Sequence, residues 1–80
     1  MNYQVVLMPA ADRDLTQLWL GSRLRHKIAS ALEQIDAELQ SDPAICGESR
    51  AGDMRIMLVA PVGVLFRIDE SQRIVAIHAV

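Results

Sequence analysis

Three short apolar runs near the C-terminal end form the clearest pattern in the chain. They cover residues 54–59, 64–69 and 74–80, and they are separated by a Pro-Gly break and a polar break. Runs of this length between turn residues predict a meander of three antiparallel strands. Each run contains one polar residue that a pure core does not need, and these are Arg55, Arg67 and His78. The three residues are therefore the first candidates for a functional site.

The first half of the chain predicts one strand followed by two helices. Residues 3–8 are apolar and β-rich, which favours a strand. Pro9 suits the first turn of a helix, because its missing N–H has no partner there, and Gly21 suits the end of that helix. A second helix is predicted by an apolar residue at every third or fourth position, at Leu24, Ile28, Leu32, Ile35 and Leu39. Pro43 predicts that this helix ends near residue 40 or 41, with a connecting loop over residues 42–53.

These elements predict an α+β fold in the order β-α-α-β-β-β. Two helices joined by about two residues form a helical hairpin, and its apolar stripe needs a sheet to cover it. We therefore expect the hairpin to pack on one face of a small, mainly antiparallel sheet. The length of 80 residues predicts a single domain over residues 1–80.

The length of each turn in the meander decides which side chains share a face, because side chains alternate along a strand. We expect a three-residue first turn over 60–62, which pairs Arg55 with Arg67. We expect a four-residue second turn over 69–72, which places His78 opposite Gly63. Arg55, Arg67 and His78 then share one face, and the other is entirely apolar, with Ile56, Leu58, Val64, Phe66, Ile68, Val75 and Ile77. An even-length first turn would point one arginine toward the core, where an unpaired charge is costly.

Composition restricts the classes of partner. The net charge is −2, and Lys27 is the single lysine beside seven arginines. Nucleic-acid-binding domains usually carry a basic excess, so non-specific adhesion to phosphates should be weak. Cys46 is the only cysteine, so it forms no internal disulfide, and no metal-ligand spacing surrounds it. We expect no cofactor, no membrane-spanning segment and no signal peptide, hence a cytosolic protein.

The order of elements resembles that of the RelE/ParE superfamily of bacterial toxins. The start of the chain, Tyr-Gln-Val-Val-Leu-Met-Pro-Ala-Ala-Asp-Arg-Asp-Leu, is similar to that family's strand leading into a helix. The Asp42-Pro43 helix end, the Gly-Asp-Met-Arg-Ile strand and the segment Val-Leu-Phe-Arg-Ile-Asp also resemble its later segments. The resemblance spans nearly the whole chain and depends on the order of short motifs rather than on one signature.

The resemblance implies the toxin of a type II toxin–antitoxin pair, with an antitoxin encoded next to it as partner. Many members of the family cleave messenger RNA at the ribosome, and others inhibit DNA gyrase by binding it. Arg55 and Arg67 fall where the family carries strand arginines, and His78 resembles a C-terminal acid/base group of some members. This implies metal-independent RNA cleavage in which arginines hold the phosphate and histidine transfers a proton.

Three hypotheses remain open from the sequence. The first, which we favour, is a ribosome-associated mRNA endonuclease that uses Arg55, Arg67 and His78. The second is a gyrase inhibitor that acts by protein binding, and the third is a non-toxic interaction domain with the same fold. A homodimer is compatible with all three. Strand arginines and a histidine near a chain end are also common as plain surface residues.

Overall fold

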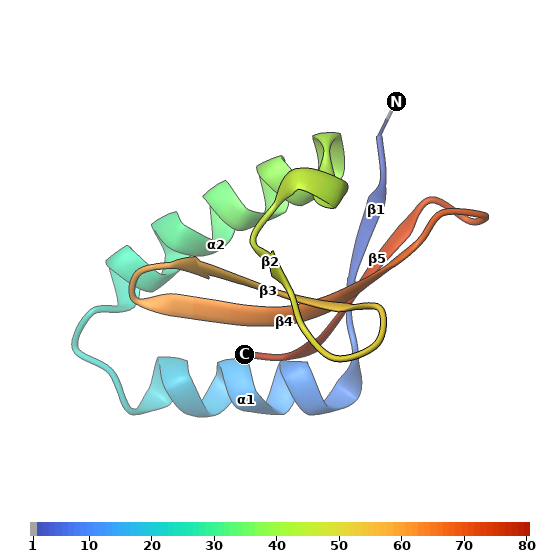
Figure 1. The fold of residues 1–80 in the computed structure, drawn as a ribbon. Coiled ribbons are helices and arrows are strands. Elements are labelled where there is room, and N and C mark those ends of the chain that lie inside the picture. Colours follow the sequence, from blue (N-terminus) through green and yellow to red (C-terminus); the bar gives the residue numbers. More distant parts are fainter. Residues whose placement is uncertain (1) are drawn as a thin grey trace.

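Two helices lie on the same side of a five-stranded sheet in residues 2–80, which the computed structural model describes (Figure 1). The elements in chain order are β1 (Gln4–Leu7), α1 (Pro9–Leu20), α2 (Arg25–Ser41), the 3-10 helix η1 (Pro43–Ile45), β2 (Glu48–Ser49), β3 (Met54–Val59), β4 (Val62–Asp69) and β5 (Ile74–Ala79). The α+β class and the position of the helical hairpin on one face are as predicted.

The sheet has the order β1-β5-β4-β3-β2. β1 runs parallel to β5, and the other neighbouring strands are antiparallel, which confirms the mainly antiparallel sheet. The helical hairpin follows β1 in the chain, and the last strand of the meander, β5, pairs with β1. β1 and β2 form the two edges of the sheet.

Both ends of α1 and the end of α2 follow the sequence signals, whereas α2 begins later than predicted, because four residues (21–24) rather than about two join the helices. α1 has Pro9 in its first turn and Gly21 directly after its last residue, and the N–H of Gly21 donates to the carbonyl of Gln17 at 3.0 Å. α2 ends at Ser41, two residues before Pro43. Residues 42–53, predicted as a loop, also contain η1 and β2. β2 has two residues, which is too short to give an alternating pattern in the sequence.

The predicted register of the first hairpin is wrong. β3 and β4 are joined by two residues, Ala60 and Pro61, so that Val59 pairs with Val62 and Arg55 lies opposite Phe66 rather than Arg67. The even-length turn reverses the faces of β3 relative to β4. Arg55 therefore lies on the helix-covered face, near the β2 edge of the sheet.

The second hairpin has four connecting residues, 70–73. Arg67 therefore pairs with Ala76, whereas the predicted partner was Ile74. This shift of two residues leaves the faces of β4 and β5 as predicted, because side chains repeat every second residue. The register then changes between Phe66, which pairs with Ile77, and Leu65, which pairs with Ala79.

The core lies between the helices and the covered face of the sheet. α2 supplies Ile28, Ala31, Ile35 and Leu39, α1 supplies Ala11, and the sheet supplies Met57, Val62, Val64, Phe66, Val75 and Ile77. Ile56 and Leu58, predicted to be in the core, are 36% and 75% exposed on the opposite, open face. In the described part of the chain, neither helix is long and apolar enough to cross a membrane.

Candidate functional sites on the two sides of the sheet

Arg67 lies on the open face of the sheet, on β4. Its Nε donates to Oδ1 of Asp53 at 3.0 Å, and the two side chains remain 51% and 68% exposed. Asp53 comes from the loop before β3, and the pairing of Met54 with Arg67 places that loop beside the arginine. The guanidinium keeps its other nitrogens for a ligand, but a ligand phosphate must compete with the Asp53 carboxylate for it.

His78 lies in the irregular part of β5. Leu65 pairs with Ala79 and Phe66 with Ile77, so His78 is the extra residue of a β-bulge. Side-chain alternation places it on the open face with Ala76, and it is half-buried. The structure thus keeps Arg67 and His78 on the same face, as predicted, although their strands are not in the predicted register.

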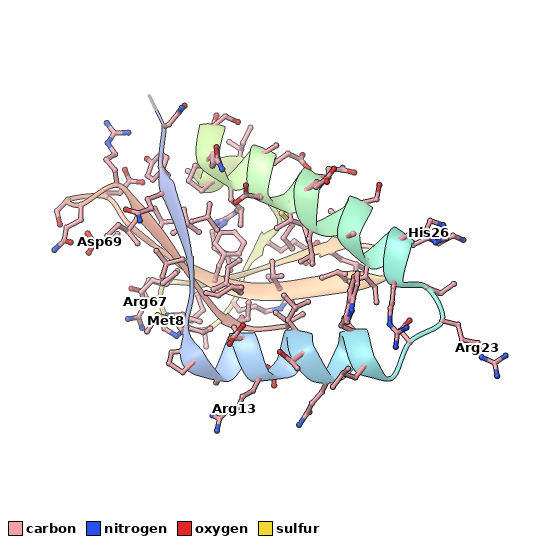
Figure 2. The ribbon with its side chains drawn as sticks, turned by 180° about the vertical axis from the view of Figure 1, so that it is seen from behind. Met8, Arg13, Arg23, His26, Arg67 and Asp69 are labelled. Carbon is pink, nitrogen blue, oxygen red and sulfur yellow. The ribbon has the colours of Figure 1, made fainter. Side chains whose placement is uncertain are left out.

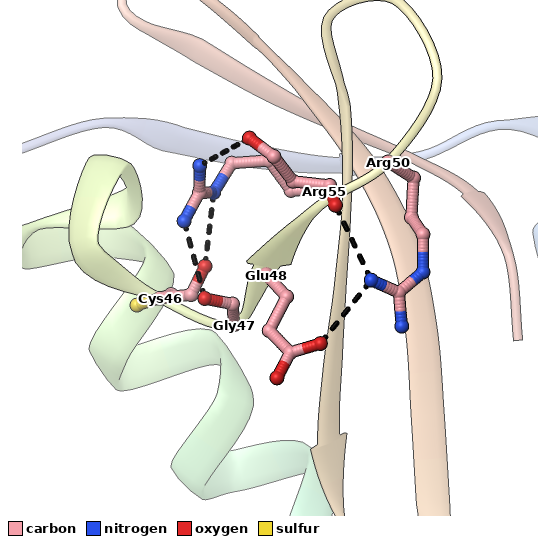
Figure 3. Close-up of polar contacts among 6 residues, drawn as sticks. Cys46, Gly47, Glu48, Arg50 and Arg55 are labelled. Atoms are coloured by element: carbon pink, nitrogen blue, oxygen red, sulfur yellow. Dashed lines mark hydrogen bonds and ion pairs between the residues drawn. The ribbon is translucent and has the colours of Figure 1, made fainter.

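Arg55 lies on the covered face and is bound to the chain around β2 (Figure 3). Its Nε donates to the carbonyl of Cys46 at 3.0 Å, and its other nitrogens donate to the carbonyl of Gly47 at 3.2 Å and to the hydroxyl of Ser49 at 3.1 Å. These acceptors remove the cost of an unpaired charge, which explains why an even-length turn is tolerated. Arg55 thus fastens the segment over residues 46–49 to β3.

A shallow hollow of about 380 Å³ lies on the open face near the β2 edge. Its lining residues are Gly47, Glu48, Arg50, Ile56, Leu58 and Gly63. Arg50 forms an exposed ion pair with Glu48 at 3.2 Å on its rim (Figure 3). The floor is apolar because Ile56 and Leu58 point outward, so the hollow is suited to an apolar side chain of a partner rather than to a phosphate. No sequence pattern indicated this hollow, because Ile56 and Leu58 were expected in the core.

A second candidate surface is the groove between α1 and α2, here called the inter-helix groove. One part of it has a volume of about 250 Å³ and is lined by Val5, Leu7, Leu15, Leu32, Ile35, Asp36 and Ile77. A second part of about 220 Å³ shares Leu15 and Leu32 and adds Thr16, Trp19 and Leu20. Figure 2 shows α1 and α2 separated from each other, one on each side of this groove. Its lining is almost wholly apolar.

The inter-helix groove also borders the free edge of β1. The N–H of Gln4 donates to Arg73 and that of Met8 to Ile77, so the even-numbered residues of β1 face β5. In a parallel ladder the alternate residues, Val5 and Leu7, then direct their N–H and C=O groups away from β5. The sheet order leaves this edge without a neighbouring strand in the described residues.

Cys46 is the first residue of the segment that Arg55 holds, and its side chain is buried. Its thiol donates to the carbonyl of Asp42 at 3.3 Å. Burial is the main cause that raises the pKa of this thiol, and the nearby carboxylates of Glu38 and Asp42 add to it. The thiol is therefore protonated at neutral pH and is a poor nucleophile. Among the residues with described positions, no three of His, Cys, Asp and Glu gather as a metal site.

The fold is similar to that of solved bacterial toxin structures. A chain of the RelBE2 toxin–antitoxin complex of Mycobacterium tuberculosis is 23% identical, with a TM-score of 0.80 over 99% of this chain and 88% of that one. A mutant of the E. coli toxin RelE in the free state is 18% identical, with a TM-score of 0.72 over 99% and 81%. A chain of the chromosomal ParDE system of P. aeruginosa is 17% identical, with a TM-score of 0.70 over 96% and 91%.

No family model and no curated protein matches the sequence. The structural likeness is thus at the level of the fold, and it shows that this chain has the RelE/ParE toxin fold.

Proposed function

We propose that this chain is the toxin of a type II toxin–antitoxin pair. The observation that carries the proposal is the likeness of 99% of the chain, at a TM-score of 0.80, to a structure solved as a toxin–antitoxin complex. The inter-helix groove fits this proposal, because its apolar lining borders a sheet edge to which a partner strand can add. The partner is an antitoxin, encoded by a neighbouring gene.

The antitoxin is expected to bind through an extended segment along β1. The outward N–H and C=O groups of Val5 and Leu7 can pair with a strand of the partner, and Leu15, Leu32 and Ile35 can receive its apolar side chains. Main-chain pairing supplies affinity in this mode of recognition, and pockets for alternate side chains supply specificity. Net charge contributes little attraction for an acidic partner, because this chain itself carries −2.

The open face supports action on a protein target better than action on RNA. Ile56 and Leu58 present apolar surface around a hollow of about 380 Å³. Arg55 donates to three acceptors of its own chain, and Arg67 is paired with Asp53. A phosphate-binding site needs arginines whose donors are free, whereas a protein contact gains from exposed apolar residues near its centre. We therefore favour a toxin of the gyrase-inhibitor type, which binds its target through the open face.

RNA cleavage is the second candidate, because Arg67 and His78 do share the open face. In this mechanism Arg67 leaves Asp53 and holds the scissile phosphate, and His78 transfers the proton between the attacking 2′-hydroxyl and the leaving 5′-oxygen. Arg55 would take part only if the segment over residues 46–49 moved and released it. No metal or cofactor is needed for this chemistry.

Inducible expression with and without the neighbouring small gene tests the proposed function. We expect expression of this chain to arrest growth, and co-expression of the neighbouring gene to relieve the arrest. If expression never arrests growth, the chain is a non-toxic interaction domain. The unaltered chain should arrest growth with DNA damage signalling while messenger RNA stays intact. Leu58→Asp introduces a charge into the apolar floor and should abolish both the arrest and the signalling. Arg13→Asp, on the solvent face of α1, is the control.

The same expression assay separates the second candidate. If messenger RNA is cut at ribosomes, and if Arg67→Ala and His78→Ala each abolish both cutting and arrest, the chain is an endonuclease and the protein-binding mechanism is wrong. Arg67→Ala also frees Asp53, so Arg67→Gln with Asp53→Asn serves as the matched pair that keeps neutral hydrogen-bonding groups at both positions.

A further inference from the structure

The exposed side of α2 has its charges segregated along the helix. Arg25, His26 and Lys27 occupy the first turn, and Glu33, Asp36 and Glu38 occupy the second half. All six are exposed. Figure 2 shows Arg23 and His26 directed into solvent at the hairpin end of the molecule. The helix thus has a basic and an acidic half.

Within residues 2–80 no ion pair neutralises these charges, although Asp36 accepts a hydrogen bond from Nε2 of Gln40 at 2.7 Å. The ion pairs found in residues 2–80 are Arg50–Glu48 and Arg67–Asp53, and neither involves α2. Oppositely charged residues three or four positions apart attract each other on a helix, but the residue four positions after Lys27 is Ala31. The positive end of the helix dipole also adds to the basic first turn instead of offsetting it. The arrangement is unfavourable in an isolated copy.

The same arrangement is favourable between two antiparallel copies of α2. Lys27 and Glu38 are eleven positions apart, which is about three helical turns plus 20°, so they lie on the same flank. Arg25 and Asp36 have the same separation and lie together on the other flank. The flanks are the two sides of the helix next to the contact with the second copy. In an antiparallel pair related by a two-fold axis, the same flank of each copy lies on the same side of the contact, so its residues face those of the other copy. Lys27 then meets Glu38 of the second copy, and the helix dipoles also oppose each other favourably.

We propose that this chain forms a homodimer in which the exposed faces of two α2 helices pack antiparallel around a two-fold axis. The seam consists of His26, Ser30, Glu33 and Ala37, whose spacings of four, three and four follow a coiled-coil pattern. Ser30 and Ala37 are small and allow close approach. Lys27–Glu38 pairs form one flank. Arg25 and Asp36 lie on the other flank, where Arg25 donates to the carbonyls of Trp19 and Leu20 at 2.9 and 3.3 Å and Asp36 borders the inter-helix groove.

Exposed apolar residues lie at the two ends of α2. Leu20 and Leu24 lie beside the start of the helix and are 68% and 44% exposed, and Ile45 lies beyond its end and is 77% exposed. The antiparallel arrangement puts Leu20 and Leu24 of one copy at the same end as Ile45 of the other. The seam itself has no large apolar residue, so charge attraction supplies much of the affinity. The dimer is therefore weak and sensitive to salt.

Sedimentation of the purified chain tests the dimer. We expect a concentration-dependent dimer at about 20 mM NaCl that dissociates at about 500 mM, where the screening length falls to a few ångströms. Lys27→Glu and Glu38→Lys should each raise the dissociation constant about tenfold or more, because each creates two like-charge contacts. The double variant Lys27→Glu/Glu38→Lys restores opposite charges and should bring the constant back to within about threefold of the original.

Arg13→Glu is the matched control for Lys27→Glu, because it changes the net charge by the same amount on α1 and should leave the dimer unchanged. Circular dichroism confirms that each variant is folded. A chain that stays monomeric at low salt, a dimer unaffected by Lys27→Glu, or a double swap that fails to restore association would each overturn the proposal. The measurement is made on purified protein and gives no information on growth arrest, so it can fail or succeed independently of the proposed toxin function.

Discussion

Gly47 shows how a single backbone position determines the geometry of the β2 edge. It has φ +64°, in the left-handed region that favours glycine. A Cβ at this position would collide with the main chain of Ile56, with the carbonyl carbon 2.7 Å away. The close approach allows the carbonyls of residues 46 and 47 to meet the Arg55 side chain. One glycine and one arginine thus hold the segment over residues 46–49 against β3.

Gly47→Ala should lower the free energy of unfolding by more than about 3 kcal/mol, because it combines backbone strain with a collision against main-chain atoms. Gly52→Ala is a matched control. Gly52 has φ +68° but no atom near the added Cβ. It should therefore cost only about 1 kcal/mol of strain. Urea unfolding followed by circular dichroism measures both values, and equal losses for the two variants would contradict the role of the Ile56 contact.

At the scale of elements, β3 depends on the connection that follows it. Its sequence is apolar on both faces apart from Arg55, so its pattern does not show which face is buried. The two-residue connection to β4 decides this, and it turns Met57 and Val59 inward and Ile56 and Leu58 outward. The apolar floor of the open-face hollow is a direct result.

Alanine substitutions at neighbouring positions of β3 test this orientation. Met57 is 7% exposed, so Met57→Ala should cost about 2–4 kcal/mol of stability through lost burial and a cavity. Leu58 is 75% exposed, so Leu58→Ala should stay within about 0.5 kcal/mol. Denaturant midpoints of the two variants give the comparison. The predicted three-residue turn requires the opposite order, and finding that order would show the observed register to be wrong.

At the scale of the whole molecule, stability depends on one core that both helices and the sheet share. Phe66 is the single phenylalanine, is fully buried, and lies on the central part of the sheet between β3 and β5. A domain of this size has a total stability of about 4–12 kcal/mol, so one large core side chain is a substantial part of it. Loss of Phe66 should affect every element together.

Phe66→Ala should cost about 3–5 kcal/mol and leave the chain largely unfolded at 37 °C. Leu20→Ala, at a residue 68% exposed, is the control and should change stability by less than about 0.5 kcal/mol. Thermal unfolding by circular dichroism reports both. A cooperative transition of Phe66→Ala within a few degrees of the unaltered chain would mean that the core is not the single unit described here.

Local signals in the sequence were enough to predict the two helices, four of the five strands and their order, but not η1 or β2. Pro9, Gly21 and Pro43 act locally on helix boundaries, and the five apolar positions of α2 repeat at the period of one helix, so both signals can be read without knowledge of the rest of the fold. The faces of β4 and β5 were also readable, because a shift of two residues leaves side-chain alternation unchanged.

The face of β3 and the surroundings of the candidate residues depend on how segments far apart in the chain pack together. A two-residue turn in place of a three-residue turn exchanges the two faces, and both choices satisfy the local pattern. The partners of Arg55 and Arg67 come from residues 46–49 and from Asp53, in a stretch without periodic signal. The partner of each charged group depends on how separate segments pack together. Local sequence patterns therefore do not predict these partners.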